Sequence, residues 1–346
     1  MQAERLRHPD TLDPVAADRP DLTLCQVVAA VLPAGRLVYG MQLPIQSLST
    51  VYAEPWEASA GAAELAAVAR AADAAGFWYL GVCDHVAIPE SRSATMGTTW
   101  WDTVATLGWL AGITTKARLL SHVAVVAYRH PLQTAKAWST LDTVSGGRAL
   151  LGVGAGHLEA EFALLGIDFA ARGAALDEAI DALRAAFGNE YPSVDGPIWS
   201  FTGLGQRPRP VQVGGPPIWI GGSSKPALRR AAERGDGWLP QGPVSAEAIA
   251  FLLEHRRTTV GEEPFDIGAL VGAVYVGEPD WDVGPCLSGS PAKIAHVLHK
   301  YAAMGVGQVQ VRFRSRSVDE LIEQVGRFGA EVGPQLEGQD GDRMAG

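Results

Sequence analysis

The sequence has few cysteines, an excess of acidic over basic residues, and no long hydrophobic run. Its three cysteines, Cys25, Cys83 and Cys286, are odd in number and far apart, so they fit neither a disulfide framework nor a zinc-binding spacing. With 28 Lys and Arg against 38 Asp and Glu, the net charge of −10 argues against binding to nucleic-acid phosphates. These features predict a reduced, cytoplasmic protein with buried thiols and no nucleic-acid partner.

Several sequence signals of other protein classes are also missing. No run of about 18 apolar residues is present, so we expect no membrane span. The apolar stretch 22–37 lacks a basic flank and contains Pro33 and Gly35, which is untypical of a signal peptide. The sequence has no P-loop, no H-E-x-x-H and no G-x-S-x-G motif, and no cluster of metal ligands. Kinase, zincin and serine hydrolase activities are therefore not predicted.

Glycine is abundant, and one glycine-rich stretch organises the chain. Residues 138–161 predict the end of a helix, a buried strand at 149–153, a turn and the start of another helix. Gly152, Gly154 and Gly156 alternate at the end of the strand, where a backbone without Cβ atoms can approach an anion such as phosphate. The dinucleotide fingerprint fails, because His157 occupies its third glycine position. Close packing at a barrel end is the alternative reason for these glycines.

The hydrophobic pattern predicts eight strands, each followed by a helix, as in a (β/α)8 barrel. A doubly wound open sheet is the alternative α/β fold. The chain divides into an N-terminal extension (1–36), a TIM-like barrel (37–333) and a flexible tail (334–346), with a Pro/Gly-rich insertion after strand four at 188–217. The predicted strands lie at 37–43, 77–86, 119–127, 149–153, 217–222, 237–240, 267–276 and 308–313, and the helices at 61–75, 102–112, 132–144, 172–187, 226–234, 245–258, 291–304 and 318–328.

The active site of such a barrel lies at the C-terminal ends of its strands, and this rule selects the candidate residues. Asp84 and His85 end strand two, where a histidine can pass a proton and a neighbouring carboxylate can hold its ring. An Asp that caps a loop beside a core or solvated His is the alternative. The other candidates at strand ends are Gln42, His122, Val123, Gly154, Ala155, Gly156, His157, Gly221, Gly222, Ser223 and Ser224.

The charged residues near these strand ends have simpler interpretations. His157 could face the same cavity or belong to a surface loop. Glu159 and Glu161 place negative charge in the first turn of a helix, where the helix dipole favours it. Arg129 and His130 precede Pro131, and we expect them to fix a loop.

Three long motifs resemble a known family. They are YRHPLQTAKAWSTLDTVSGGRALLGVGAGHLEAEF, PPIWIGGSSKPALRRAAERGDGWLP and SGSPAKIAHVLHKYAAMGVGQVQVRF, and the match extends over about residues 37–328. The chain is similar to the luciferase-like monooxygenases, and within them to the oxidoreductases that use the deazaflavin coenzyme F420. The resemblance implies a TIM-like barrel that holds a flavin or deazaflavin in its C-terminal mouth.

The resemblance also assigns roles to the candidate residues. Gly154–Gly156 and Gly221–Ser224 match the loops that hold the cofactor phosphate, and His122–Val123 matches a non-prolyl cis peptide behind the ring. Asp84 and His85 match an Asp-His pair beside the redox ring, whereas His157 stands where some relatives have a catalytic Glu. This implies hydride transfer between F420 and a small organic substrate. His85 would move a proton or contact the reactive face of the ring, Asp84 would orient His85, and His157 would be a second acid-base candidate or a substrate contact.

Two alternatives to this activity remain open. One is a monooxygenase that uses reduced FMN and oxygen, and the other is a flavin-binding protein without turnover. Because family members are often dimers, the resemblance also suggests a homodimer.

Overall fold

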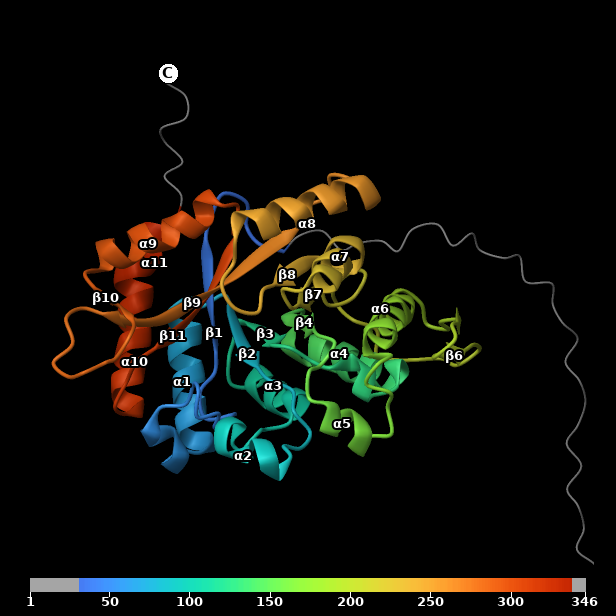
Figure 1. Cartoon of the computed structure of the whole chain (residues 1–346), viewed down its shortest axis with the longest axis horizontal. Coiled ribbons are helices and arrows are strands. Elements are labelled where there is room, and N and C mark those ends of the chain that lie inside the picture. Colours follow the sequence, from blue (N-terminus) through green and yellow to red (C-terminus); the bar gives the residue numbers. More distant parts are fainter. Residues whose placement is uncertain (1–30, 338–346) are drawn as a thin grey trace, which may run out of the picture.

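The computed structural model describes residues 31–337, and within them eight parallel strands form a closed barrel (Figure 1). Pairing of β8 with β9 and of β11 with β1 closes the sheet, which confirms the (β/α)8 fold and excludes the open sheet. The barrel strands are β1 (Val38–Gln42), β2 (Tyr79–Val82), β3 (Arg118–Ser121), β4 (Ala149–Val153), β7 (Ile218–Gly221), β8 (Gly237–Leu239), β9 (Asp266–Val276) and β11 (Gln308–Phe313).

Helices surround the barrel, and several begin at a residue that caps the first turn. The Asp102 side chain accepts a hydrogen bond from Ala105 N at the start of α3, and Ser224 caps α7 in the same way. Gly146 ends α4 in the left-handed conformation, with φ +67°. The helices are α1 (Ala62–Ala74), α2 (Glu90–Met96), α3 (Thr103–Ala111), α4 (Pro131–Ser145), α5 (Glu159–Leu164), α6 (Arg172–Gly188), α7 (Lys225–Arg234), α8 (Ala246–Thr259), α9 (Pro291–Ala303), α10 (Val318–Arg327) and α11 (Gly333–Leu336).

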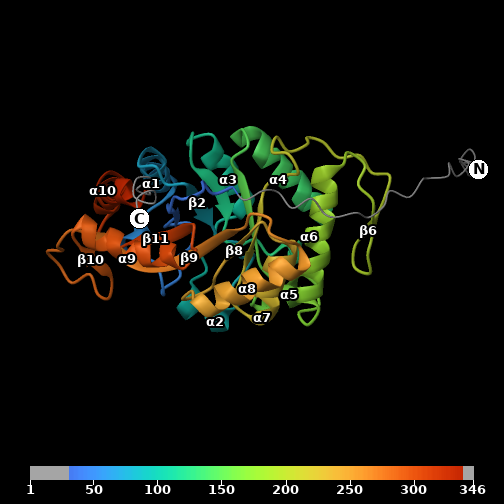
Figure 2. The same cartoon turned by 90° about the horizontal axis from the view of Figure 1, so that it is seen from above.

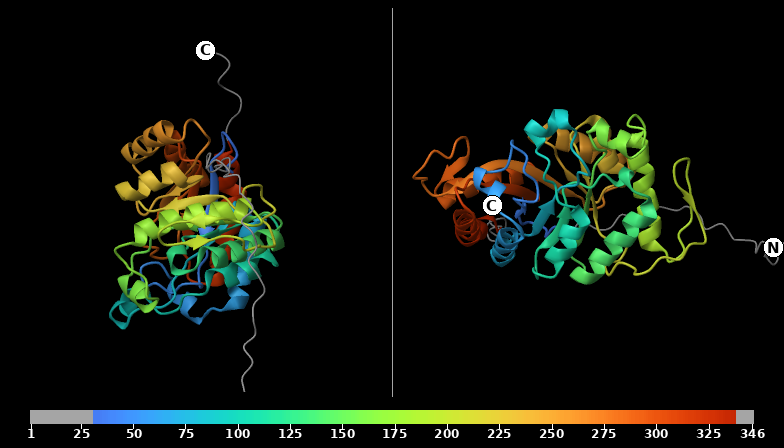
Figure 3. Two further views of the ribbon diagram at one scale, coloured as in Figure 1. Left: turned by 90° about the vertical axis from the view of Figure 1, so that its right-hand side faces the viewer. Right: turned by 90° about the horizontal axis from the view of Figure 1, so that it is seen from below.

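The insertion after strand four contains a short hairpin. Strands β5 (Val194–Asp195) and β6 (Ser200–Phe201) pair in antiparallel fashion and project beyond α6 (Figure 2). A further strand that the sequence did not predict, β10 (Leu287–Gly289), extends the sheet beside the second half of β9. Helix α2 was also not predicted, whereas α5 begins at Glu159, where the sequence predicted the start of a helix. Both helices lie on the lower side in Figure 1, which Figure 3 (right) views directly.

Strand β3 is shorter than its sequence predicts. The apolar run continues to Ala127, but the strand ends at Ser121 and the chain turns into a 3₁₀ helix, η2 (Val126–Tyr128). The peptide bond between His122 and Val123 is cis, as the resemblance implied. Beyond Ser121 the segment keeps an isolated bridge between Ala124 and Val153 of β4, and His122, Val123 and Val125 line the mouth of the barrel.

Both chain ends differ from the sequence expectation. Residues 31–36, which were assigned to the extension, reach the bottom of the barrel, where the backbone N–H groups of Val31 and Leu32 donate to Asp266. At the other end α11 continues past Pro334 and buries Leu336, so the predicted tail begins too early. Residues 1–30 and 338–346, and with them Cys25, lie outside the described residues. No helix among residues 31–337 has the length and apolar character needed to cross a bilayer.

Candidate active site

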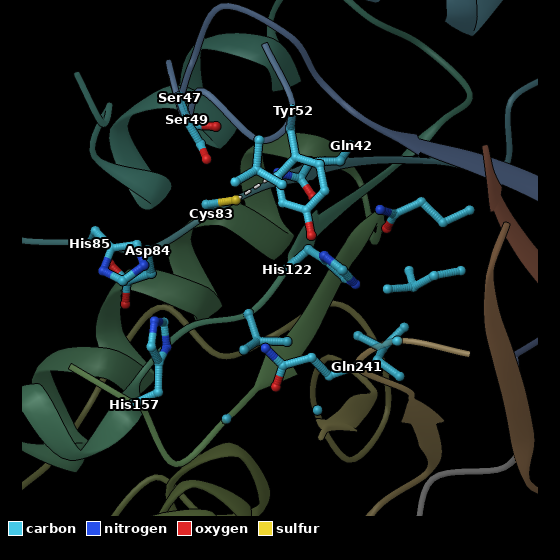
Figure 4. Close-up of a pocket in the computed structure, with 18 of the residues that line it drawn as sticks. Gln42, Ser47, Ser49, Tyr52, Cys83, Asp84, His85, His122, His157 and Gln241 are labelled. Atoms are coloured by element: carbon cyan, nitrogen blue, oxygen red, sulfur yellow. Dashed lines mark hydrogen bonds between the residues drawn. The ribbon is translucent and has the colours of Figure 1, made fainter. Parts of the chain in front are cut away.

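A cavity of about 1020 Å³ opens at the C-terminal ends of the barrel strands. All thirteen of the site residues predicted from the sequence line it. Figure 4 shows His85, Asp84 and His157 on one side of this cavity, with Gln42, His122 and Gln241 on the other. The prediction that these strand ends meet at one pocket thus agrees with the structure.

The sharpest feature of the pocket is a pair formed by His85 and Glu161. The Nδ1 atom of His85 lies 2.8 Å from Glu161 Oε2. The other carboxylate oxygen accepts hydrogen bonds from the backbone N–H groups of Val86 (2.6 Å) and Ala87 (3.1 Å), and Tyr128 donates its hydroxyl proton to Oε2. Burial favours the neutral acid, but these hydrogen bonds together hold the pKa of Glu161 below its usual range.

Glu161 therefore has a role that its sequence position did not suggest. It is buried, with a side chain 1% exposed, and does not merely complement the helix dipole. It also makes the contact with His85 that was predicted for Asp84, whose carboxylate makes its hydrogen bonds elsewhere. The Asp84 carboxylate pairs instead with Arg129, whose guanidinium donates to both oxygens at 2.8 Å. The expectation that Asp84 orients His85 is wrong; Glu161 does so.

Two rings lie against His85. Its ring centroid is 4.4 Å from that of Trp100 and 5.5 Å from that of His157, both in edge-to-face arrangements. His157 is exposed at the rim of the pocket, so it faces the cavity and also belongs to a surface loop. The two histidines and the tryptophan form one corner in which a substrate group could exchange a proton.

The opposite side of the pocket carries neutral polar groups. Gln42 donates its amide N–H to the Cys83 sulfur at 2.8 Å, and burial raises the pKa of the Cys83 thiol to about 11. Burial also lowers the pKa of His122 to about 4, so this ring is neutral at physiological pH. Among residues 31–337, no group of three His, Cys, Asp or Glu side chains is placed to hold a metal ion.

The glycines of the two turns are required in part by packing. A Cβ atom at Gly154 would lie 2.6 Å from Val123 Cγ2, and one at Gly221 would lie 2.9 Å from Val123 Cγ1. At Gly152 a Cβ would meet the carbonyl oxygen of Ser121 at 2.1 Å. The alternative reason given for the alternating glycines, close packing at the barrel end, therefore holds at these positions.

The same turns also offer free hydrogen-bond donors. The backbone N–H groups of Ala155, Gly156 and His157 donate to no acceptor in the described part of the chain, and neither do those of Ser223 and Ser224. They line the pocket beside the N-terminus of α7. Such a cluster of free N–H groups at a helix N-terminus fits a phosphate group. The residues present are thus compatible with a phosphate-bearing flavin or deazaflavin.

Three residues of the site were missed or assigned a different role: Glu161, Arg129 and Tyr128. One sequence signal could have found the first of them. Leu158 and Phe162, at i and i+4, are buried and define the inner face of α5, and Glu161 lies on that face whereas Glu159 does not. No comparable local signal identifies Arg129 or Tyr128, because their partners, Asp84 and Glu161, are distant in sequence.

Comparison with known proteins places the chain in a family. Residues 39–283 match the family described as luciferase-like monooxygenases. A protein of Mycobacterium tuberculosis described only as uncharacterised is 30% identical over 215 residues, which cover 58% of this chain and 74% of that protein. The chain belongs to the luciferase-like monooxygenase family, whose members are oxidoreductases.

Solved structures with low sequence identity share the fold. Monooxygenase RslO1 from Streptomyces bottropensis superposes with a TM-score of 0.70 at 20% identity, covering 86% of this chain and 99% of that one. The coenzyme F420-dependent tetrahydromethanopterin reductase from Methanopyrus kandleri gives a TM-score of 0.66 at 18% identity, with coverage of 87% and 99%.

Proposed function

We propose that this protein transfers a hydride between coenzyme F420 and a small organic substrate, with His85 exchanging the proton. The observation that carries the proposal is the pairing of His85 with the buried Glu161 at the mouth of the barrel. The pocket that His85 shares with the two glycine turns is large enough for both a cofactor and a substrate.

The pair determines which ring nitrogen of His85 handles the proton. An ionised carboxylate only accepts hydrogen bonds, so Nδ1 of His85 carries its proton toward Glu161. The other nitrogen, Nε2, is then free to take a proton from a substrate hydroxyl or to return one to a carbonyl. Glu161 stabilises the imidazolium that forms, as the carboxylate does in a catalytic triad.

The cofactor would supply the hydride chemistry, and residues of this chain would hold it. The free N–H groups of 155–157 and 223–224 would bind its phosphate, and Gln42, His122 and Val123 would lie against its ring. His157 would contact the substrate or act as a second acid-base group. The assembly as a homodimer remains a prediction.

A reduced-FMN monooxygenase is the second candidate, because the family match and the fold of RslO1 fit it equally. The test is a pair of fluorescence titrations of the apoprotein, one with F420 and one with FMN. We expect micromolar binding of F420 and much weaker binding of FMN. The opposite preference, together with oxygen uptake in the presence of reduced FMN, would replace the proposal by the monooxygenase.

Two further outcomes are informative. Tight F420 binding, with no oxidation of the reduced cofactor by any of a panel of ketones and aldehydes and no reduction of the oxidised cofactor by alcohols, would favour a binding protein without turnover. Binding of neither cofactor would contradict the redox function altogether.

A further inference from the structure

One side chain sets the fit between three loops of the pocket. Val123 lies in the segment that follows β3, and its two methyl groups fill the space left by Gly154 and Gly221. A shift of this segment would therefore change the shape of both glycine turns. The position of residues 122–126 therefore affects the shape of the pocket wall that the two glycine turns form.

The carboxylate of Asp84 holds this segment in place. It accepts a hydrogen bond from the backbone N–H of Val125 at 3.0 Å and forms the two-pronged ion pair with Arg129 at the end of the same segment. The Asp84 side chain is 2% exposed, whereas that of Arg129 is 33% exposed. Asp84 thus ties β2 to two points of the neighbouring loop.

Behind the segment lies a second cavity of about 240 Å³. Ala124 and Val126 form one wall of it, Trp138 of α4 lines it, and the Asp84–Arg129 pair borders it. Side-chain packing therefore does not fully support the segment from this side. Backbone hydrogen bonds of Ala124 with Gly152 and Gly154 hold the middle of the segment to β4, and the ion pair holds the chain beyond it beside this cavity.

From these three observations we propose that Asp84 and Arg129 are positioning residues: their ion pair holds Val123 where the cofactor ring binds and takes no part in proton transfer. The inference rests on the proposed cofactor site. It assigns Asp84 and His85, which are adjacent in sequence, to separate tasks, since His85 is held by Glu161 and Asp84 by Arg129.

The Asp84→Asn variant separates the two tasks. It retains an acceptor for Val125 N–H but loses the ion pair, so the chain between Val125 and Arg129 is held less firmly beside the second cavity. Because the variant loses a charged, two-pronged pair, we expect the Kd for F420 to rise about tenfold. We also expect a changed visible spectrum of the bound cofactor at saturation. Arg129→Lys keeps the charge without the two-pronged geometry and should give an intermediate Kd.

A matched control is available in the insertion. Glu190 and Arg207 also form a two-pronged ion pair, at 2.9 and 2.6 Å, but on the surface. Glu190→Gln should leave both Kd and spectrum unchanged. A purely structural defect in Asp84→Asn would lower the melting temperature and the number of binding sites per chain, but not change the Kd or the spectrum of the sites that remain.

The outcomes distinguish this inference from the proposed function. If the wild-type protein binds neither F420 nor FMN, the proposed function is wrong and the inference falls with it. If the wild type binds and Asp84→Asn binds with the same Kd and spectrum, only the inference is overturned. Should Asp84→Asn not fold, Arg129→Lys decides in the same way.

Discussion

Glu159 and Glu161 lie on the same short helix but have different environments. Glu159 is exposed, whereas Glu161 is buried against His85 and Tyr128. A buried carboxylate is stable in the charged form only when hydrogen bonds compensate its loss of hydration, and Glu161 has four donors. Substituting one glutamate should therefore affect the chemistry, and substituting the other should not.

We expect Glu161→Gln to lower kcat about 10–100-fold, because the amide cannot stabilise a protonated His85 in the transition state. The affinity for the cofactor should change little. The measurement is kcat as a function of pH, with F420 reduction followed by its absorbance. Glu159→Gln is the control and should match the wild type. Equal kcat values for the two variants would contradict a role of Glu161 in proton transfer.

Two glycine-to-alanine substitutions should act in opposite directions. Gly154→Ala places a methyl group against Val123, and we expect overpacking to lower the free energy of unfolding by about 1–3 kcal/mol and to weaken cofactor binding.

Gly108 lies on the exposed face of α3, and no atom lies within 4 Å of the position that a Cβ atom would take. Gly108→Ala should therefore stabilise the protein by about 0.5–1 kcal/mol. Urea unfolding measures both. If Gly154→Ala left the free energy of unfolding unchanged, Val123 would be free to move away from the added methyl group.

At the scale of elements, Asp73 on α1 fixes the turn that leads into β3. Its carboxylate accepts hydrogen bonds from the backbone N–H groups of Thr115, Lys116 and Ala117 at 2.7–2.9 Å. Burial alone would raise the pKa of Asp73, but these bonds outweigh it and the net pKa is lowered. A lowered carboxyl pKa contributes stability above the unfolded value, near about 4, that is lost as the pH falls.

We therefore expect Asp73→Asn to destabilise the protein by about 1–3 kcal/mol at pH 7, since an amide cannot accept from all three N–H groups. The difference from the wild type should shrink as the pH falls from about 5 to 3. Urea unfolding across this range provides the measurement. Asp195→Asn, on the exposed hairpin, is the control. A difference independent of pH would show that Asp73 is not ionised in the fold.

Elements with a strong local pattern could be predicted from the sequence. The eighth strand was predicted at 308–313 and is observed there, and helix 61–75 differs from α1 by one residue at each end. Elements whose limits depend on tertiary contacts were not located as well. Strand three ends six residues early because regular pairing stops at Ser121 and an isolated bridge at Ala124 follows, although its composition remains apolar.

The candidate site was predictable only in part, for a related reason. The strand-end rule places Asp84 and His85 at the pocket, because it depends on the position of residues along a strand. It cannot state which carboxylate contacts which base. Glu161 and Arg129 are 76 and 45 residues from their partners, and only the closed barrel brings them together.

At the scale of the whole molecule, the bottom of the barrel is connected to the pocket by packed side chains. Val31 and Leu32 contact a buried cluster inside the barrel, which Val123 of the pocket wall also contacts. That cluster comprises Tyr79, Leu120, Leu150, Trp219 and Leu239. Val31 and Leu32 are therefore part of the barrel's packing, and their loss from this position would lower the stability of the fold.

Asp266 is the polar group of this attachment, and its protonation should affect stability. It accepts hydrogen bonds from Val31 N, Leu32 N and Trp219 Nε1, yet burial raises its pKa to about 6. A raised carboxyl pKa contributes stability that is fully present below the unfolded pKa of about 4 and is lost as the pH rises through about 6.

The stability of the wild type relative to Asp266→Asn should therefore fall by about 2–3 kcal/mol between pH 4 and pH 7, since one pKa unit corresponds to about 1.4 kcal/mol. Urea unfolding at several pH values measures this difference, with Asp195→Asn as the control for a surface carboxylate. A difference that grows with pH would mean that the three donors outweigh burial and that Asp266 is ionised in the folded protein. In that case Asp266 would hold residues 31–32 most firmly at neutral pH, and the attachment would weaken in acid instead.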